Sequence, residues 1–241
     1  MVDVELDDGL AVLTIDRPHA RNAISLDTMA ELEKALDALE SSADARALVI
    51  TGAGDRAFVS GGDLKELAAI RTVEDASAMA WRMRMICDRL AEFPAPVIAA
   101  LNGHAFGGGG EVAVAADIRI AADDVKIAFN QVSLAIMPAW GGAERLAALV
   151  GAGRALLLAG SGTPVDAAEA LRIGLVDNVV ARASFDETWR AVARSLANRP
   201  ATEIKRVIAG TTPEEAVASF ARLWVADEHW EAADKVMRPS K

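Results

Sequence analysis

The chain has 241 residues, of which 52% are hydrophobic and 25% charged, and its formal net charge is −10. This composition is typical of a folded globular protein, and an acidic chain without a dense lysine and arginine patch is not expected to bind nucleic acid. The single cysteine, Cys87, excludes an internal disulfide, and without a membrane-length apolar run or a signal-peptide pattern we expect a cytoplasmic protein with no membrane partner.

The first half of the chain is predicted to alternate strands with helices. Apolar residues recur at a spacing of two in the strands and at three or four in the helices. In chain order we predict two strands within residues 2–16, a helix at 25–40 capped by Ser25 or Asp27, a strand at 47–51, a glycine turn before a short helix at Asp63, and a helix at 74–93 that buries Ala76, Met79, Met83, Ile86 and Leu90.

The second half continues the alternation and then becomes helical. We predict strands at 96–103, 116–123, 125–129 and 176–180, a helix that opens near Glu111, helices within 141–151 and 153–160, a helix with Thr163 as N-cap and Pro164 at its first position, and helices from about 184 onward. Strands that alternate with helices indicate an α/β fold with a helical C-terminal portion.

Four consecutive glycines, Gly107 to Gly110, stand directly before Glu111 in the stretch HAFGGGGEVAVAAD. A phosphate-binding loop does not fit, because Lys-Ser/Thr is missing and a carboxylate would repel phosphate. Close packing of a helix start against a neighbour is one remaining explanation. The other is an oxyanion hole, in which unpaired N–H groups at the helix start bind a thioester or ester oxygen beside Glu111.

An oxyanion hole needs a second N–H donor, and FVSGGDLKEL supplies a candidate. Its Gly61-Gly62 pair also lies between a predicted strand and a predicted helix start. An ordinary strand-to-helix turn would have the same pattern. Two glycine-lined helix starts in one α/β chain nevertheless favour a site that binds a carbonyl oxygen.

Five motifs in order resemble those of the crotonase (enoyl-CoA hydratase/isomerase) superfamily along nearly the whole chain. They are RPHARNAISL, FVSGGDLKEL, NGHAFGGGGEVAVAADIRIA, PAWGGAERL and DAAEALRIGLVDNVV. The resemblance implies a spiral of ββα turns in residues 1–183. It also implies a helical region in residues 184–241 that belongs to the same domain unit and forms a homotrimer or a dimer of trimers. The ending AADKVMRPSK differs from the usual one.

The resemblance also implies the site residues and the ligand. The amides of Gly62 and Gly108 would bind the thioester carbonyl, and Glu111 would carry protons. Coenzyme A would enter as part of the substrate, with no permanently bound cofactor and no metal. The positions matched to the coenzyme A site are Arg17, Ala23, Ser60, Gly62, Asp63, Leu64 and Gly108. Asp63 could equally cap a helix, and Arg17 could be a solvated surface charge.

One site position departs from the family pattern. Hydratases of the family use two glutamates, and the second lies seven residues before the proline of the Pro-x-x-Gly-Gly motif. Counting back from Pro138 reaches Gln131, whose amide orients water or a carbonyl by hydrogen bonding but exchanges no proton near neutral pH. Neither neighbour of Gln131 is acidic.

Three functions therefore remain open. The first is hydration or isomerisation of an enoyl-CoA with Glu111 as the acid and base. The second is decarboxylation of a 2-carboxyacyl-CoA of the malonyl type, because MPAWGG resembles the Pro-Ser-Trp-Gly-Gly of some decarboxylases of the family. The third is acyl-CoA binding without turnover. Trp140 in the same segment could either line the acyl pocket or pack in the core.

Overall fold

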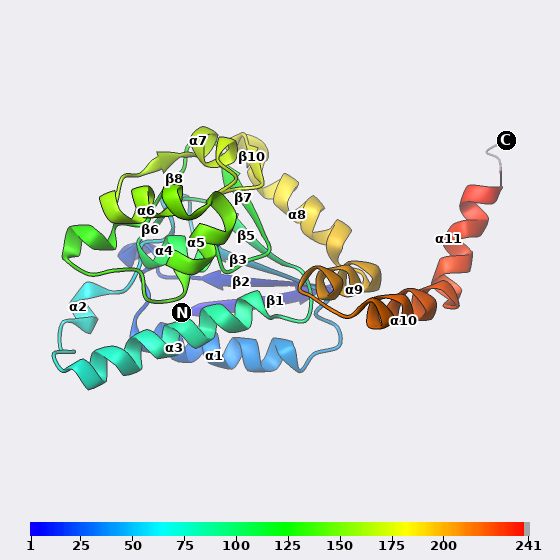
Figure 1. Cartoon of the computed structure of the whole chain (residues 1–241), viewed down its shortest axis with the longest axis horizontal. Helices are drawn as coiled ribbons and strands as arrows, with labels where there is room; N and C mark the ends of the chain where they lie inside the picture. The colour runs from blue at the N-terminus through cyan, green and yellow to red at the C-terminus, as the bar shows by residue number, and fades with distance from the viewer. Residues whose placement is uncertain (239–241) are drawn as a thin grey trace.

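A six-stranded sheet forms the spine of the computed structural model, which describes residues 1–238 (Figure 1). Only the first two strands are antiparallel, and all later neighbours are parallel. The hairpin between them turns at Asp8 and Gly9, which both have positive φ, as a two-residue turn requires. The strands lie in the order β1 (Val2–Asp7), β2 (Leu10–Ile15), β3 (Ala47–Gly52), β5 (Val97–Leu101), β7 (Ile118–Ala122) and β10 (Asn178–Val180).

A second, smaller sheet has four short strands in the order β4 (Ala57–Val59), β6 (His104–Phe106), β8 (Lys126–Ala128) and β9 (Val165–Asp166). Each of the first three follows a strand of the large sheet and precedes a helix. The three units are β3–β4–α2 (Leu64–Leu67), β5–β6–α4 (Gly108–Ala113) and β7–β8–η2 (Asn130–Leu134). This repeated ββα turn confirms the predicted α/β spiral.

Helices cover the sheets on the outside. α1 and α3 lie side by side and are joined by a bidentate pair in which Arg82 donates to Glu33 at 2.7 Å twice. Ser25 caps α1 by accepting the Thr28 N–H, which settles the choice between Ser25 and Asp27. The helices up to residue 172 are α1 (Leu26–Glu40), α2 (Leu64–Leu67), α3 (Val73–Ala91), α4 (Gly108–Ala113), α5 (Gly142–Val150), α6 (Ala152–Ser161) and α7 (Ala167–Arg172). Short 3-10 helices lie at Pro18–Ala20 (η1), Asn130–Leu134 (η2) and Arg182–Ser184 (η3).

Two sequence-based predictions about helices were wrong. Thr163 is not an N-cap, because residues Val165–Asp166 pair with β8 and hold the backbone extended; α7 then begins at Ala167, with Asp166 accepting the Glu169 N–H at 2.8 Å. Ala76 is exposed rather than buried, because the first turns of α3 extend past α1 (Figure 1). The buried face of α3 is formed further along, by Met83, Ile86, Cys87 and Leu90.

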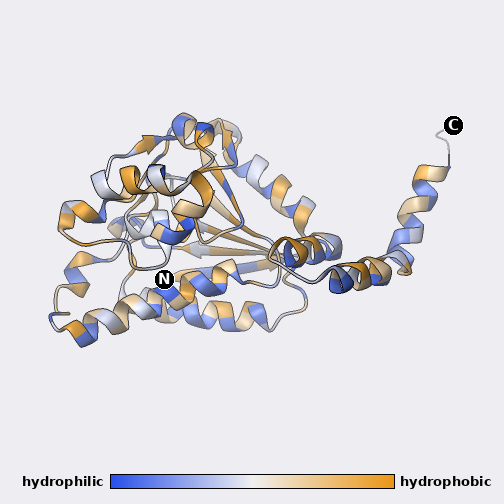
Figure 2. Ribbon diagram, in the orientation of Figure 1, coloured by the Kyte–Doolittle hydropathy of each residue, from blue (hydrophilic) through white to orange (hydrophobic). Residues whose placement is uncertain are grey.

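The last four helices differ in how they meet the body. α8 (Phe185–Leu196) buries Phe185, Trp189 and Ala193 against the large sheet. α9 (Arg199–Ile208) is tied to the body by Lys205, which lies 2.7 Å from the Asp117 carboxylate. α10 (Pro213–Trp224) and α11 (Asp227–Met237) lead away from the sheets (Figure 1), and all three carry hydrophobic and hydrophilic residues along each helix (Figure 2). Their exposed apolar side chains include Ile204, Ile208, Val217, Phe220, Trp224 and Trp230.

The predicted C-terminal region of residues 184–241 thus begins with a core helix, and its residues 239–241 lie outside the described residues. A groove of about 1190 Å³ lies between the last three helices and the C-terminal ends of α1 and α3. Among residues 1–238, no helix is both long and apolar enough to traverse a lipid bilayer.

Candidate active site

Two glycine turns meet at the carboxyl ends of β4 and β6. The two strands pair in parallel, so the turns that follow them, Ser60–Asp63 and Gly107–Gly108, end at the same edge of the small sheet. The approach is close, since a Cβ atom on Gly61 would lie 3.3 Å from the Gly108 nitrogen. The sequence placed these segments 47 positions apart in the chain, and the parallel pairing brings them together.

The backbone amides of Gly62 and Gly108 donate to no acceptor within residues 1–238. Around Gly62, the Ile24 N–H binds the Gly61 carbonyl and the Asp63 N–H binds the Ile24 carbonyl, both at 2.8 Å. These bonds satisfy the neighbouring peptides and leave the Gly62 N–H unpaired. Gly108 is the first residue of α4, where the N–H has no intrahelical partner. Both candidate oxyanion donors are therefore available to a ligand.

The glycine run also serves packing, which confirms the first of its two explanations. Gly107 has φ +56°, which a residue with a side chain rarely adopts. A Cβ atom on Gly109 would overlap the Val59 carbonyl oxygen of β4. The run lets α4 lie directly on the small sheet, and this close contact sets the position of the Gly108 amide.

Glu111, on the first turn of α4, is only 2% exposed. Its Oε2 accepts backbone N–H bonds from Trp140 at 2.7 Å and Gly142 at 3.0 Å, and its Oε1 accepts the Gln131 amide at 2.8 Å. Gly142 must be glycine, because a Cβ atom there would overlap the Glu111 side chain. Burial raises the pKa of Glu111 above its ordinary value, and the three hydrogen bonds oppose this shift.

Gln131 lies on η2 and is 7% exposed. Its Nε2 donates to Glu111, whereas its buried Oε1 has no hydrogen-bond partner within residues 1–238. A buried amide oxygen without a partner is costly unless a ligand or water satisfies it. The residue that stands in place of a second glutamate therefore touches Glu111 and offers one free acceptor.

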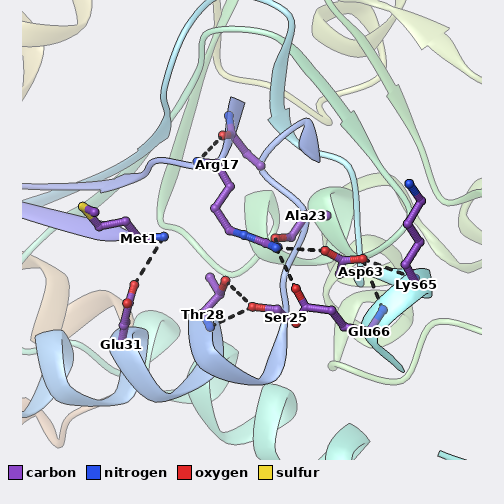
Figure 3. Close-up of polar contacts among 10 residues, drawn as sticks. Met1, Arg17, Ala23, Ser25, Thr28, Glu31, Asp63, Lys65 and Glu66 are labelled. Carbon is purple, nitrogen blue, oxygen red and sulfur yellow. Dashed lines mark hydrogen bonds and ion pairs between the residues drawn. The ribbon is translucent and has the colours of Figure 1, made fainter. Parts of the chain in front are cut away.

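Arg17 is neither solvated nor free (Figure 3). Its guanidinium lies 3.0 Å from the Asp63 carboxylate and 2.9 Å from that of Glu66, and it donates to the Ala23 carbonyl at 2.6 Å. Only 13% of the Arg17 side chain is exposed. The ion pairs join the segment of residues 17–24 to the start of α2, immediately after the Gly62 turn.

Asp63 caps α2 and also pairs with Arg17, which confirms the helix-cap role; a contact with coenzyme A stays a prediction. Its Oδ1 accepts the N–H groups of Lys65 and Glu66 at 3.2 and 3.5 Å. Burial alone would raise the pKa of Asp63, but the Arg17 hydrogen bond and the capped amides lower it below its ordinary value. The carboxylate is thereby held in its charged form.

The remaining positions matched to the coenzyme A site lie around the same turn. Ala23 is buried beside the Ile24–Gly62 bridge, and Leu64 is 60% exposed. Ser60 is half-buried and lines a cavity of about 540 Å³ together with Arg56 and His104. Within residues 1–238, no three acidic, histidine or cysteine residues are grouped so as to hold a metal ion.

Sequence reasoning missed three supports of the site. The Trp140 and Gly142 amides hold Glu111, and Asn22 ties three segments together. Asn22 is buried with φ +56°, donates to the carbonyls of Ala53 and Ala57, and accepts the Arg17 N–H at 3.0 Å. The Gly141-Gly142 pair in the sequence could have indicated the Trp140 and Gly142 amides, because paired glycines often mark a place where another group approaches the backbone closely. No local pattern indicated the partners of Asn22.

Comparisons with known proteins point to one family. The sequence model of the family described as enoyl-CoA hydratase/isomerase matches residues 5–214. The chain is 43% identical over 175 residues to a protein of Bacillus subtilis (strain 168) named a probable enoyl-CoA hydratase, covering 73% of this chain and 67% of that one. It is 37% identical over 204 residues to a short-chain-enoyl-CoA hydratase of Clostridium acetobutylicum, covering 85% and 78%. A crystal structure of an enoyl-CoA hydratase from Bacillus anthracis superimposes with a TM-score of 0.87 at 30% identity, over 99% of this chain and 98% of that one.

Proposed function

The chain belongs to the enoyl-CoA hydratase/isomerase family and is an enzyme of that type. From this premise we propose that it adds water across the double bond of a 2-enoyl-CoA thioester. One observation carries the proposal: the amides of Gly62 and Gly108 have no acceptor within residues 1–238, and the buried Glu111 stands on the same first turn of α4 as Gly108. Hydration requires a binding site for the thioester carbonyl oxygen and a proton carrier, placed side by side.

The thioester carbonyl oxygen accepts hydrogen bonds from the Gly62 and Gly108 amides. When water attacks the β-carbon, the electron pair of the double bond moves toward the carbonyl and forms an enolate oxyanion. Two preorganised N–H donors stabilise that charge, and the loss of one such donor costs about 3–4 kcal/mol of the barrier. The first peptide of α4 adds the positive end of a helix start.

Glu111 moves the proton. Its Oε1 has one acceptor position left beside the Gln131 amide, where an attacking water can donate. As the oxygen of that water bonds to the β-carbon, its proton passes to Glu111 and then to the α-carbon, so the elements of water are added and the carboxylate is regenerated. The raised pKa of Glu111 favours this exchange near neutral pH.

Gln131 orients rather than reacts. Its Nε2 keeps the Glu111 carboxylate in place, and its free Oε1 accepts the second hydrogen of the attacking water. An amide cannot take up the proton, so a single carboxylate carries both proton transfers. This arrangement serves isomerisation of a double bond as well, because that reaction also needs one base that returns its proton.

Coenzyme A is proposed to lie along Ala23, Ser60, Gly62, Asp63, Leu64 and Gly108 as part of the substrate, with no permanently bound cofactor. Arg17 supports this site indirectly, because its guanidinium is already engaged by Asp63, Glu66 and Ala23. It holds the Ala23 segment against the Gly62 turn. The cytoplasmic location inferred from composition stays a prediction.

A homotrimer or a dimer of trimers is proposed through the C-terminal helices α9–α11. These helices extend from the body and expose Phe220, Trp224 and Trp230 on a chain of net charge −10. Exposed apolar groups of this size are typical of protein interfaces. Light scattering after size exclusion should give a mass three or six times that of the chain, and a monomer would refute the assignment.

Decarboxylation of a malonyl-type thioester is the second candidate, favoured by the missing second acid at Gln131. It needs the oxyanion amides but no base. A substrate carboxylate would, however, have to lie near the buried Glu111 carboxylate, which disfavours this reaction electrostatically. Acyl-CoA binding without turnover would leave the unpaired Gln131 Oε1 without a catalytic role.

The deciding experiment follows the loss of the conjugated thioester's ultraviolet absorbance with crotonyl-CoA. Wild type should hydrate it, and Glu111→Gln should lose turnover by at least about 10²-fold while binding coenzyme A nearly as well, because the proton carrier is gone and the amides remain. Undiminished activity of Glu111→Gln would refute the mechanism. Release of CO₂ from malonyl-CoA without hydration would select the second candidate, and tight binding with neither reaction would select the third.

A further inference from the structure

We propose that Trp140 restricts the enzyme to short acyl chains by closing the acyl pocket directly beside the two carbonyl-binding amides. This inference rests on the proposed function, since it takes the Gly62 and Gly108 amides as the site of the thioester carbonyl. It adds a residue that sets specificity and a substrate class, short-chain acyl-CoA thioesters.

The Trp140 indole covers both glycine turns. A Cβ atom on Gly108 would overlap the six-membered ring, and one on Gly62 would lie 4.0 Å from Cζ2 of the same ring. The ring therefore packs directly on Gly108 and reaches van der Waals distance of the Gly62 turn. Trp140 is 7% exposed and belongs to the buried apolar cluster, which confirms core packing; the proposal adds that the same ring lines the acyl pocket.

The backbone of Trp140 is anchored from two sides. Its N–H donates to Glu111 Oε2 at 2.7 Å, and its carbonyl accepts from Arg145 Nη1 at 3.2 Å. Arg145 in turn pairs with Asp88 of α3 at 2.5 Å. Movement of this segment would break a hydrogen bond that holds the catalytic carboxylate, so the indole forms a fixed wall rather than a movable one.

A second apolar group narrows the same space. A Cβ atom on Gly62 would lie 2.9 Å from Cδ1 of Leu67, on the short helix α2. An acyl group whose carbonyl is bound by the two amides must place its α- and β-carbons near Glu111, and its further methylenes then meet the indole or Leu67. Large rigid side chains at such a point limit chain length, because well-packed apolar sites cannot absorb added methylenes without strain.

Titration calorimetry with coenzyme A, butyryl-CoA and octanoyl-CoA tests the inference without requiring turnover. Wild type should bind octanoyl-CoA no more tightly than butyryl-CoA. Trp140→Leu should shift the octanoyl/butyryl affinity ratio toward octanoyl-CoA by at least about tenfold, because methylenes that enter an apolar pocket each add substantial affinity. Trp140→Phe, which keeps more of the packing, should shift the affinity ratio in the same direction by a smaller factor. It provides the test if Trp140→Leu does not fold.

Trp189→Leu is the matched control, because Trp189 is also a buried tryptophan (3% exposed) but packs from α8 on the large sheet. It should leave the affinity ratio unchanged. The proposal is overturned if wild type already favours octanoyl-CoA strongly, or if folded Trp140→Leu and Trp140→Phe keep the wild-type ratio. Chain-length discrimination by an enzyme that hydrates no enoyl-CoA would refute the proposed hydration and still support the role of Trp140.

Discussion

Gln131→Glu would place two carboxyl groups in hydrogen-bond contact inside the protein. The amide nitrogen that this change removes now lies 2.8 Å from Glu111 Oε1, and the two residues are only 7% and 2% exposed. At that distance and an effective dielectric constant of about 20, two charges repel by roughly 6 kcal/mol, or about four pKa units. The pair therefore keeps one shared proton across neutral pH.

The retained proton makes the stability of Gln131→Glu fall with rising pH. In the unfolded chain both carboxyls titrate at their ordinary pKa, near 4.3, whereas the folded pair holds its proton to higher pH. The folded state thus binds more protons above that value, and the free energy of unfolding decreases as pH rises, by up to about 1.4 kcal/mol per pH unit. Wild type has the same sign through the raised pKa of Glu111.

Denaturant unfolding of both proteins between pH 5 and pH 8 measures this difference. Gln131→Met is the control, because it removes the amide hydrogen bond without adding a second carboxyl. That hydrogen bond lowers the pKa of Glu111, so its loss should leave the sign of the wild-type pH dependence unchanged. Parallel stability curves for wild type and Gln131→Glu would mean that the two side chains are not in contact, and the geometry derived for the water-binding pair would be wrong. Hydration by Gln131→Glu should continue, since a singly protonated pair contains both an acid and a base.

Two further predictions concern the supports of the site. Arg17→Met should lower the free energy of unfolding by about 1–3 kcal/mol, because it leaves the largely buried Asp63 carboxylate without its cation. It should also raise KM for the enoyl-CoA more than it lowers kcat, because the Ala23 segment is loosened. Equal loss in kcat and kcat/KM would contradict this positioning role. Gly109→Ala should lower the free energy of unfolding by more than about 3 kcal/mol or prevent folding, because its Cβ would overlap the Val59 carbonyl of β4 and neither backbone can yield. Gly153→Ala, with open space around it on α6, should be tolerated. A wild-type melting temperature for Gly109→Ala would refute the close packing of α4.

Local patterns predicted most elements of the fold. The two strands within residues 2–16, the cap at Ser25 or Asp27 and the strand at 96–103 depend on residues within a few positions of one another. The structure confirms them as a hairpin that turns at Asp8-Gly9, a Ser25 cap and the strand Val97–Leu101. Thr163 was wrong because a distant partner decided its conformation. Pairing with β8 holds residues 165–166 extended, so Asp166 is the N-cap and α7 begins at Ala167; no local pattern contains that partner.

The sequence by itself determined the family, the two glycine-lined helix starts, Glu111 and the replacement of a second acid by Gln131, because each is a matter of which residue stands at which spacing. Only the tertiary structure decided what those residues touch. Parallel pairing of β4 with β6 brought the glycine turns together, and the segment before α5 delivered the Trp140 and Gly142 amides to Glu111. Arg17 could be a solvated surface charge until Asp63, 46 positions away in the chain, was found beside it. Hydrogen bonds and ion pairs between distant segments depend on how elements pack, and packing is a property of the whole chain rather than of any stretch of it.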